Sequence, residues 1–504
     1  MQQMSAGIEG RWNREMFKGR TVLFLLMITM LGSILLTMTL TGQFSFASGA
    51  QGQGILASSD SSGLNQDEMN KINTAVQLIQ SHYFKDVDRQ KLVDGAINGM
   101  MESLDDPFSS YMGKETAQQF SESIEGSFTG IGAEVSMESG NVVVVSPIKG
   151  SPAEKAGIKA KDVILSVNGV SLQGLDLNAA VAKIRGPKGT TAKVKIKRSG
   201  NPEPLEFSIV RDDIDMETVN AHMEKNGIGV IEITQFSVNT ADRFKEELAK
   251  LEKQNMKGLV IDVRNNPGGV LSVVIDIAEQ FVPKGKNIVQ VEDKSSKREK
   301  SVSSGTGKPY PITVLTNQGS ASASEILAGA LKESAGAKLI GEKTYGKGTV
   351  QSSYDKQFND GSLLKITIAK WLTPNGEWIH KKGIEPDIKV HQPDYFSVSP
   401  INKDKTPLKY DMTSDDVKSA QIMLDGLGFK PGRKDGYFDK GTVNAVKQFQ
   451  KKQGLPVNGT VDKKTAEALE TALIKHIRDP QYDTQMKQAI KILTQEIAAS
   501  ASKK

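Results

Sequence analysis

The stretch from Pro311 to Gln351, PITVLTNQGSASASEILAGALKESAGAKLIGEKTYGKGTVQ, decides the fold of the central part of the chain. An apolar, partly β-branched run ends at an Asn-Gln-Gly turn, and apolar residues at helical spacing follow. This pattern predicts a strand, a tight turn and a helix. The turn places Ser320, Ser322 or Ser324 at the helix N-terminus, where free N–H groups and the helix dipole favour negative charge.

A serine at this position has two interpretations. It can act as a nucleophile, or it can cap the helix, because Ser-x-Ser-Glu before an apolar run is also the pattern of a capping box. The G-x-S-x-G elbow of the Ser-His-Asp hydrolases is absent from the stretch. The sequence places none of the five histidines well as a base: His82, His222, His380, His391 and His476.

A lysine follows instead, between two glycines. Lys347 can serve as a general base only if its pKa falls from about 10.4 toward the working pH, which burial achieves. If a strand begins at Lys347, the side chain of Gln351 points to the same face. Its neutral amide could hold the amine without raising the pKa of Lys347 again. The alternative interpretation is a solvated Gly-Lys-Gly loop.

Taken together, GSASASE and YGKGTVQ resemble the active-site signature of the carboxyl-terminal processing, or tail-specific, serine proteases. GLVIDVRNNPGG at 258–269 resembles a second signature of that family and again predicts strand, glycine turn and helix. ITIAKWLTPNG at 366–376 and GIEPD at 383–387 resemble its closing strands. The resemblance covers much of residues 65 to 395.

The resemblance implies a role for each site residue. Ser322 is expected to be the nucleophile, Lys347 its general base and Gln351 the third member of a triad. The backbone N–H groups of Gly268 and Ala323 are expected to form the oxyanion hole, since a tetrahedral oxyanion needs fixed donors. Neither a metal nor a cofactor is implied.

Three motifs in the segment before the core resemble a PDZ domain: GIGAEV at 130–135, SPAEKAGI at 151–158 and DVILSVNG at 162–169. Such a domain captures a free C-terminal carboxylate on backbone N–H groups and pairs the peptide with a sheet edge. Arg185 is a candidate contact between tail binding and catalysis, and its other interpretation is a solvated arginine. The predicted carboxylate-binding residues are Gly130, Ile131, Gly132 and Ala133.

Near the N-terminus, Thr21 to Thr41 runs without a charge after a basic flank. That length spans a hydrocarbon core of about 30 Å, and the flank predicts the N-terminus inside. We therefore expect a single-pass anchor in a bacterial cell membrane with the catalytic part extracytoplasmic. The alternative is a signal peptide cleaved near Ser45-Phe46-Ala47, followed by secretion.

An internal repeat marks the C-terminal part. DGYFDKGTVNAV at 435–446 recurs as NGTVDKKTAEAL at 458–469, each unit being a turn with a capping residue before a short helix. The repeat resembles the peptidoglycan-binding module of cell-wall enzymes and implies peptidoglycan as a partner. A protein-docking bundle is the alternative interpretation.

Length and composition limit the classes of protein. A chain of 504 residues exceeds one core. The net charge of +5 is small and spread out, so nothing argues for a nucleic-acid partner. The absence of cysteine excludes disulfides and suits an exported protein without proving export.

The predicted fold class is α/β multidomain, with an N-terminal helical region, a β-rich PDZ domain, a crotonase/ClpP-like protease core with a mostly parallel sheet, and a small C-terminal helical bundle. The N-terminal helices resemble helices that mediate dimerisation in the family, which suggests a homodimer, and a helical cap on the core is the alternative. The tail receives no function. The expected segments are a cytoplasmic N-terminus (1–20), an anchor (21–42), a flexible linker (43–64), the helical region (65–125), the PDZ domain (126–212), the protease core (213–395), a linker (396–410), a peptidoglycan-binding-like domain (411–475) and a helical tail (476–504).

The predicted function is an exported, membrane-tethered serine endopeptidase that recognises protein or peptide C-termini and cleaves by a Ser-Lys mechanism. A non-catalytic, wall-anchored PDZ scaffold is one alternative, and the intact Ser322, Lys347 and Gln351 argue against it. A murein hydrolase is the other, although no metal-ligand cluster or carboxylate pair stands out in the core. The sequence leaves open the physiological substrate, the preferred terminal residues and whether the PDZ domain gates activity.

Overall fold

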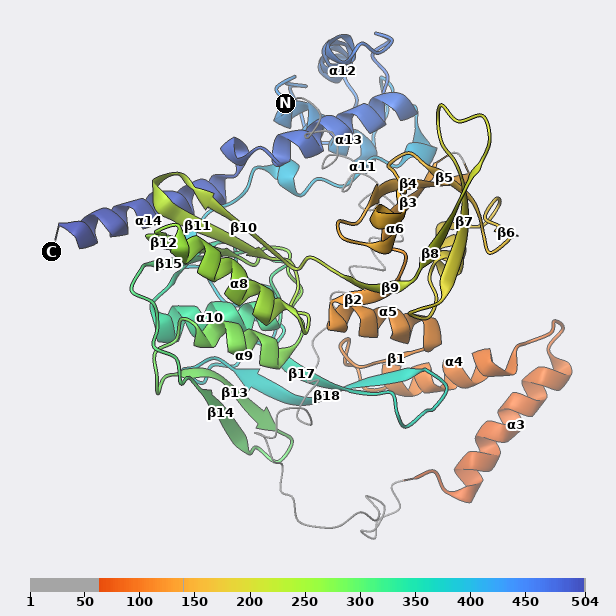
Figure 1. Ribbon diagram of the computed structural model, residues 1–504, viewed down its shortest axis with the longest axis horizontal. Helices are drawn as coiled ribbons and strands as arrows, with labels where there is room; N and C mark the ends of the chain where they lie inside the picture. The colour runs from red at the N-terminus through yellow and green to blue at the C-terminus, as the bar shows by residue number, and fades with distance from the viewer. Residues whose placement is uncertain (1–62, 139, 503–504) are drawn as a thin grey trace.

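The computed structural model describes residues 63–138 and 140–502 (Figure 1). The predicted anchor at 21–42 and most of the predicted linker lie outside the described residues. Among the helices at 63–502, none has the length and apolar character to cross a membrane.

A six-stranded sheet forms the centre of the α/β core. Its order is β10-β11-β12-β15-β16-β19, with β10 antiparallel to β11 and every later pair parallel. The expected mostly parallel sheet is therefore confirmed. Its strands are β10 (Val219–Glu224), β11 (Ile228–Ile233), β12 (Gly258–Asp262), β15 (Ile312–Thr316), β16 (Lys338–Gly341) and β19 (Ile388–Lys389).

Helices cover both faces of this sheet because its strands are apolar on both sides. Leu259 and Ile261 face the larger core, with helices α8 (Thr240–Lys253), α9 (Leu271–Glu279) and α10 (Ala323–Ala335). Val260, between them, faces the opposite side, where it packs in a cluster with α14 (Thr484–Ala501). The C-terminal tail, which received no function from the sequence, thus completes the protease core (Figure 1).

A second, antiparallel sheet lies beside the first. It contains β1 (Ser110–Met112), β13 (Asn287–Asp293), β14 (Arg298–Val302), β17 (Thr349–Tyr354) and β18 (Leu363–Leu372). Strand β1 lies within the N-terminal region, which is helical as expected apart from these three residues. A three-residue strand shows no periodicity, and its pairing with β18 comes from residues far along the chain.

Three helices flank this strand in the N-terminal region: α3 (Gln66–His82), α4 (Arg89–Glu102) and α5 (Lys114–Glu125). Helix α5 places Phe120 and Ile124 in the large core. Helix α3 has a capping box between Asn65 and Glu68 but no buried residue. Helix α4 packs beside β1, and helix α3 extends away from the body of the molecule (Figure 1).

The PDZ region has its own core and a sheet in the order β3-β4-β5-β7-β8. The chain enters and leaves this region through a two-stranded ladder of β2 (Ser127–Gly130) and β9 (Asp212–Asp215). The elements of the PDZ region are β3 (Ala133–Glu138), β4 (Asn141–Pro147), α6 (Pro152–Ala156), β5 (Val163–Val167), β6 (Val170–Ser171), α7 (Leu177–Ile184), β7 (Thr191–Lys197) and β8 (Leu205–Val210).

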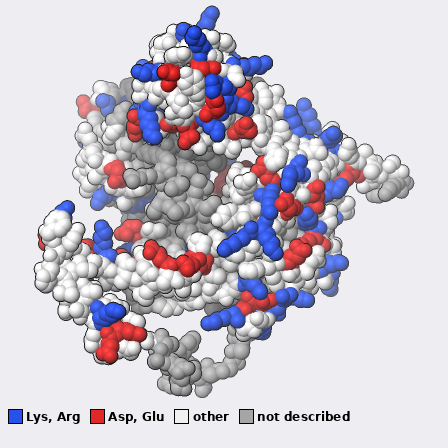
Figure 2. All heavy atoms as spheres, turned by 180° about the vertical axis from the view of Figure 1, so that it is seen from behind, with Lys and Arg blue, Asp and Glu red and all other residues white. Residues whose placement is uncertain are grey.

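The C-terminal module consists of α11 (Asp415–Gly426), α12 (Lys440–Gln453) and α13 (Lys463–Ile477) around a separate core. The sequence repeat appears as a structural repeat, because Asp439 caps α12 through the Thr442 N–H and Asp462 caps α13 through the Thr465 N–H, each at 2.8 Å. Figure 2 shows basic and acidic side chains interspersed over the upper part of the molecule, where this module lies.

Candidate active site

The turn between β15 and α10 holds the three candidate serines. The Ser320 hydroxyl donates to the Val263 carbonyl and the Ser324 hydroxyl to the Asn266 carbonyl, each at 2.8 Å. These two serines therefore hold the turn after β15 against the glycine turn after β12. Ser322 has φ 54° and ψ −113°, which is rare for a residue with a side chain, and it lies against a narrow cavity beside the turn.

The glycine turn after β12 lies directly against Ser322. Gly268 has φ 109°, and a Cβ there would lie 2.8 Å from the Ser322 Cβ and 3.0 Å from the Ala323 nitrogen, so only glycine permits this approach. The structure thus brings the two predicted oxyanion donors next to the predicted nucleophile. In this structure the Gly268 N–H donates to Asn266 Oδ1 at 2.9 Å, so it must share or release that bond to reach an oxyanion.

Lys347 lies in the loop between β16 and β17. Its side chain is almost completely buried, and Nζ lies 5.0 Å from the centroid of the Phe108 ring. Burial lowers the pKa of Lys347 to about 7, against the carboxylates of Asp106 and Glu325, which work to raise it. A large fraction of this amine is therefore neutral near pH 7, as a general base requires.

Gln351 is fully buried on β17, and its amide donates to the hydroxyls of Thr349 at 2.9 Å and Thr367 at 3.0 Å. Strand β17 begins at Thr349 rather than at Lys347, so the alternation argument for a shared face does not apply to the lysine. A role for Gln351 in holding Lys347 remains a prediction.

One buried carboxylate, which the sequence indicated only as part of a capping box, joins the serine and lysine segments. Glu325 Oε2 accepts the Ser322 N–H at 2.9 Å and the Lys347 N–H at 2.8 Å. Oε1 accepts the Gly346 N–H at 2.7 Å and the Thr344 hydroxyl at 2.5 Å. Burial raises the pKa of Glu325, while these hydrogen bonds work to lower it. Glu325 thereby fixes the backbone of nucleophile and base relative to each other.

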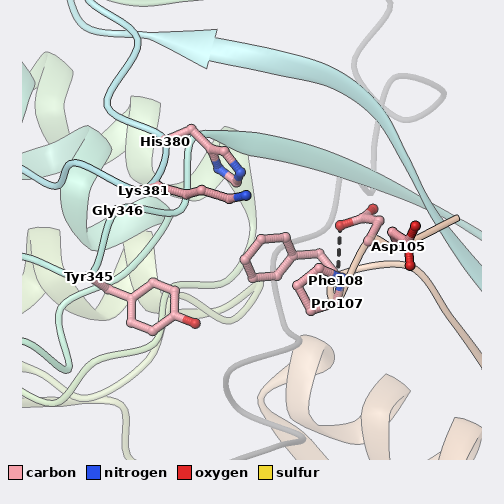
Figure 3. A pocket seen from close by; sticks show the side chains of 8 residues that line it. Asp105, Pro107, Phe108, Tyr345, Gly346, His380 and Lys381 are labelled. Atoms are coloured by element: carbon pink, nitrogen blue, oxygen red, sulfur yellow. Dashed lines mark hydrogen bonds between the residues drawn. The ribbon is translucent and has the colours of Figure 1, made fainter. Parts of the chain in front are cut away.

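The N-terminal region supplies a further wall that the sequence did not indicate. Asp106 and Phe108 lie beside Lys347, and together with Tyr345 and His380 they border a pocket of about 390 Å³ (Figure 3). His380 accepts the Gly348 N–H through Nδ1 at 3.3 Å, so this histidine supports the lysine loop. Asp106 and Phe108 come from a segment more than two hundred residues before Lys347, which no local pattern can connect to it.

In the PDZ region, the predicted carboxylate-binding residues span the loop between β2 and β3. Gly132 has φ 76°, and a Cβ there would lie 2.3 Å from the Ser151 Cβ, so glycine is required. The Ile131 carbonyl accepts the Ala153 N–H at 2.8 Å, which ties the loop to α6. Strand β3 pairs only with β4 among the described strands, so it is an edge strand of the PDZ sheet.

Arg185 follows α7 and is not a purely solvated arginine. Its guanidinium forms an ion pair with Glu122 of α5 and lies 4.9 Å from the centroid of the Phe128 ring. It therefore joins the PDZ region to the helix that packs on the protease core. Within the described ranges, no group of three or more His, Cys, Asp or Glu side chains is arranged to hold a metal ion.

Four family models match the chain. They are peptidase family S41 over residues 227–390, a PDZ domain over 143–198, a putative peptidoglycan binding domain over 413–469 and the activating protease CtpB N-terminal domain over 28–116. The first match contains the strained serine, the buried lysine and the glycine turn described above. Together they define a peptidase of family S41 that carries a PDZ domain and a domain similar to peptidoglycan-binding modules.

Individual relatives agree with this class. The carboxy-terminal processing protease CtpB of Bacillus subtilis (strain 168) is 50% identical over 84% of this chain and 89% of the relative, and CtpA of the same organism is 46% identical over 94% and 98%. A solved structure, the photosystem II D1 C-terminal processing protease, is 28% identical over 64% of this chain and 92% of its own, with a TM-score of 0.38. The chain belongs to peptidase family S41 and is a carboxy-terminal processing serine protease with a PDZ domain.

Proposed function

We propose that the protein cleaves peptide bonds by a Ser-Lys mechanism. Neutral Lys347 takes the proton from Ser322 Oγ as this oxygen attacks the scissile carbonyl carbon. The Gly268 and Ala323 N–H groups stabilise the oxyanion of the tetrahedral intermediate. Protonated Lys347 then gives its proton to the leaving amine, and a water molecule, deprotonated by the same lysine, hydrolyses the acyl-enzyme.

The observation that carries this proposal is the Glu325 bridge. One carboxylate oxygen accepts the backbone N–H of both Ser322 and Lys347, and the lysine is buried with its pKa lowered to about 7. A capping serine and a solvated lysine loop need neither feature.

The pH profile of kcat/KM should follow the charge of Lys347. The protonated amine cannot accept the Ser322 proton, so activity should fall about tenfold per pH unit below its pKa of about 7 and level off above it. Initial rates on a peptide without titrating groups, measured between about pH 5 and pH 9, check this expectation. A rate that keeps rising about tenfold per pH unit up to pH 9 would instead indicate a solvated lysine.

We further propose that the PDZ region selects substrates by their C-termini. The tail would add to the outer edge of β3, with its carboxylate on the loop from Gly130 to Ala133. The narrow cavity beside Ser322 is lined by apolar side chains, among them Leu271, Ile326 and Trp371, which favours an apolar residue before the scissile bond. The contact between Arg185 and Glu122 offers a path from the bound tail to the core.

One substrate in two forms tests both the cleavage and the tail recognition. An unstructured peptide ending in an apolar residue, with a free or an amidated C-terminus, is incubated with the wild type and the Ser322→Ala variant. We expect cleavage by the wild type alone, with a lower KM for the free end because the amide removes the charge that the loop binds. Equal cleavage rates on both forms of the peptide would contradict tail recognition. If neither enzyme cleaves the peptide, the result would favour the non-catalytic scaffold.

We also propose that residues 21–42 anchor the protein in the cytoplasmic membrane of a bacterium, with the catalytic part outside and the C-terminal module on peptidoglycan. Protease accessibility in intact spheroplasts and sedimentation with purified sacculi test these two placements.

The partner proposed for α3 is a second copy of the chain. Apolar side chains of α3 are left exposed, including Leu78 at 54% and Ile79 at 40%. Light scattering should give twice the mass of one chain, and a single-chain mass at micromolar concentration would contradict the dimer.

A further inference from the structure

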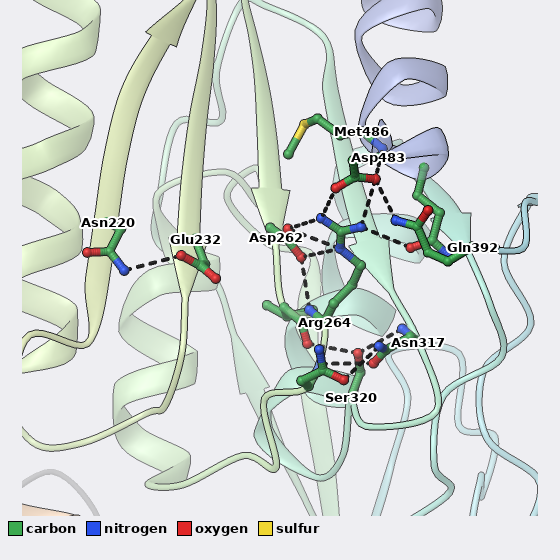
Figure 4. A network of polar contacts seen from close by, with 12 residues as sticks. Asn220, Glu232, Asp262, Arg264, Asn317, Ser320, Gln392, Asp483 and Met486 are labelled. Carbon is green, nitrogen blue, oxygen red and sulfur yellow. Dashed lines mark hydrogen bonds and ion pairs between the residues drawn. The ribbon is translucent and has the colours of Figure 1, made fainter. Parts of the chain in front are cut away.

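The guanidinium of Arg264 lies beside the glycine turn of the active site. Arg264 lies two residues beyond β12 and four before Gly268. It donates to Asp262 from Nε at 2.9 Å and from Nη2 at 2.6 Å, and it is largely buried (Figure 4). A buried guanidinium that lost one of its acceptors would move, because an unpaired buried charge is costly.

The remaining acceptors for Arg264 come from the far end of the chain. Asp483 accepts from Nη2 at 2.8 Å and from Nη1 at 3.1 Å, and Gln485 accepts from Nη1 at 3.0 Å. Asp483 also caps α14 through the Met486 N–H at 2.9 Å. Burial works to raise the pKa of Asp483, but Arg264 holds that pKa below its usual value, so the carboxylate is charged at neutral pH.

The backbone that follows Arg264 leads directly into the Gly268 turn and is hydrogen-bonded to the loop that carries Ser322. The Asn265 N–H donates to Asn317 Oδ1 at 2.9 Å, on the loop that leads to Ser322. The Asn266 carbonyl accepts the Ala321 N–H at 3.0 Å, directly before the nucleophile. A displacement of Arg264 therefore reaches Gly268 and Ser322 through short, directional contacts.

Asp483 itself is held by the segment that enters the C-terminal module. Gln392 Nε2 donates to Asp483 Oδ1 at 2.6 Å, and Gln392 Oε1 accepts the Thr484 N–H at 3.1 Å. The module is thus an insertion between β19 and α14 whose two ends meet at this point. The Arg264 network lies where the inserted module rejoins the core.

We propose that Asp483 is a positioning residue of the peptidase reaction, which holds Arg264 and thereby the Gly268 turn in the geometry needed to stabilise the oxyanion. This inference rests on the Ser-Lys function proposed above. It assigns a positioning role to the residue that caps the N-terminus of α14.

The test uses the full chain with Asp483→Asn, which keeps the shape of the side chain and removes its charge. We expect kcat to fall by about tenfold to a hundredfold with KM nearly unchanged, because a misplacement of about 1 Å can cost on the order of a hundredfold. A peptide boronic acid, which forms a tetrahedral adduct with the serine, should bind more weakly by the same factor as kcat/KM. Binding of a product peptide should not change.

Asp479→Asn is the matched control, because Asp479 lies four residues earlier and accepts the Gln481 N–H without contacting Arg264. Its kcat should equal that of the wild type. Gln392→Ala removes a support of Asp483 while keeping the ion pair, so it should lower kcat in the same direction by a smaller factor. This variant decides the question if Asp483→Asn does not fold.

A kcat of Asp483→Asn within twofold of the wild type would overturn the proposal. Equal losses in the affinities for the boronic acid and for the product peptide would also overturn it, because they would indicate that the whole active site has become less ordered. If Asp483→Asn does not fold, a wild-type kcat for Gln392→Ala overturns it. Ser322→Ala is measured alongside. Activity in that variant would refute the proposed function, whereas its inactivity beside an active Asp483→Asn refutes only the positioning role.

Discussion

Ser322→Ala is expected to abolish peptide cleavage, and Lys347→Met to lower kcat by at least about a thousandfold. In the first variant no oxygen is present to attack the substrate, and in the second no base accepts its proton. Nucleophile and base act as one unit, so the double variant should be no slower than the single variants. Release of a fluorogenic product at fixed pH measures all three.

Thermal unfolding separates these losses from misfolding. In the unfolded chain Lys347 is protonated at pH 7, whereas burial lowers its pKa in the folded protein to about 7, so folding works against protonation of this amine. Lys347→Met should therefore melt at a higher temperature than the wild type, and this gain should shrink as the pH rises toward 10.5. Rapid cleavage by either single variant would disprove the Ser-Lys assignment.

Glu325→Gln is expected to lower kcat by roughly a hundredfold with little change in KM. Each carboxylate oxygen of Glu325 accepts two hydrogen bonds, and the NH₂ group of glutamine cannot accept any. If the NH₂ group takes the place of Oε2, it faces the Ser322 and Lys347 N–H groups; if it takes the place of Oε1, it faces the Gly346 N–H next to the lysine. In either orientation the lysine loop loses a hydrogen bond, so Lys347 shifts relative to Ser322. Misplaced reacting groups of this kind cost on the order of a hundredfold in rate.

Glu333→Gln on the same helix provides the comparison. Glu333 accepts only the Asn375 N–H among the described contacts, near the protein surface, and this variant should retain the wild-type kcat. Steady-state kinetics with one peptide, together with the melting temperature, cover both variants. A wild-type kcat in Glu325→Gln would show that the bridge does not hold the reacting geometry.

The parts that the sequence predicted are those encoded by local patterns. The run at Ile312 to Leu315 and the helical spacing after it predicted β15 and α10, and two glycine motifs predicted the turns. Glu325 was visible only as a capping box, because its bonds to the Lys347 loop join segments that no periodicity relates.

Contacts over long sequence separations account for what was missed. Phe108 reaches Lys347, and Asp483 reaches Arg264 across 219 residues, through tertiary packing alone. The helix of the tail was expected, but its burial was not, since an amphipathic helix does not indicate which surface it will cover. The Arg185 ion pair with Glu122 was likewise invisible, because an arginine in a loop has the same pattern whether it is solvated or paired.

The hydrogen bonds between Gln392 and the Asp483–Thr484 pair have a consequence for how such enzymes diversify. Because the two ends of the inserted module lie side by side, a module of this kind can be acquired, replaced or lost as a cassette without lengthening the path between β19 and α14. The module can therefore change by a single genetic event while the strands and helices that carry the catalytic residues stay the same.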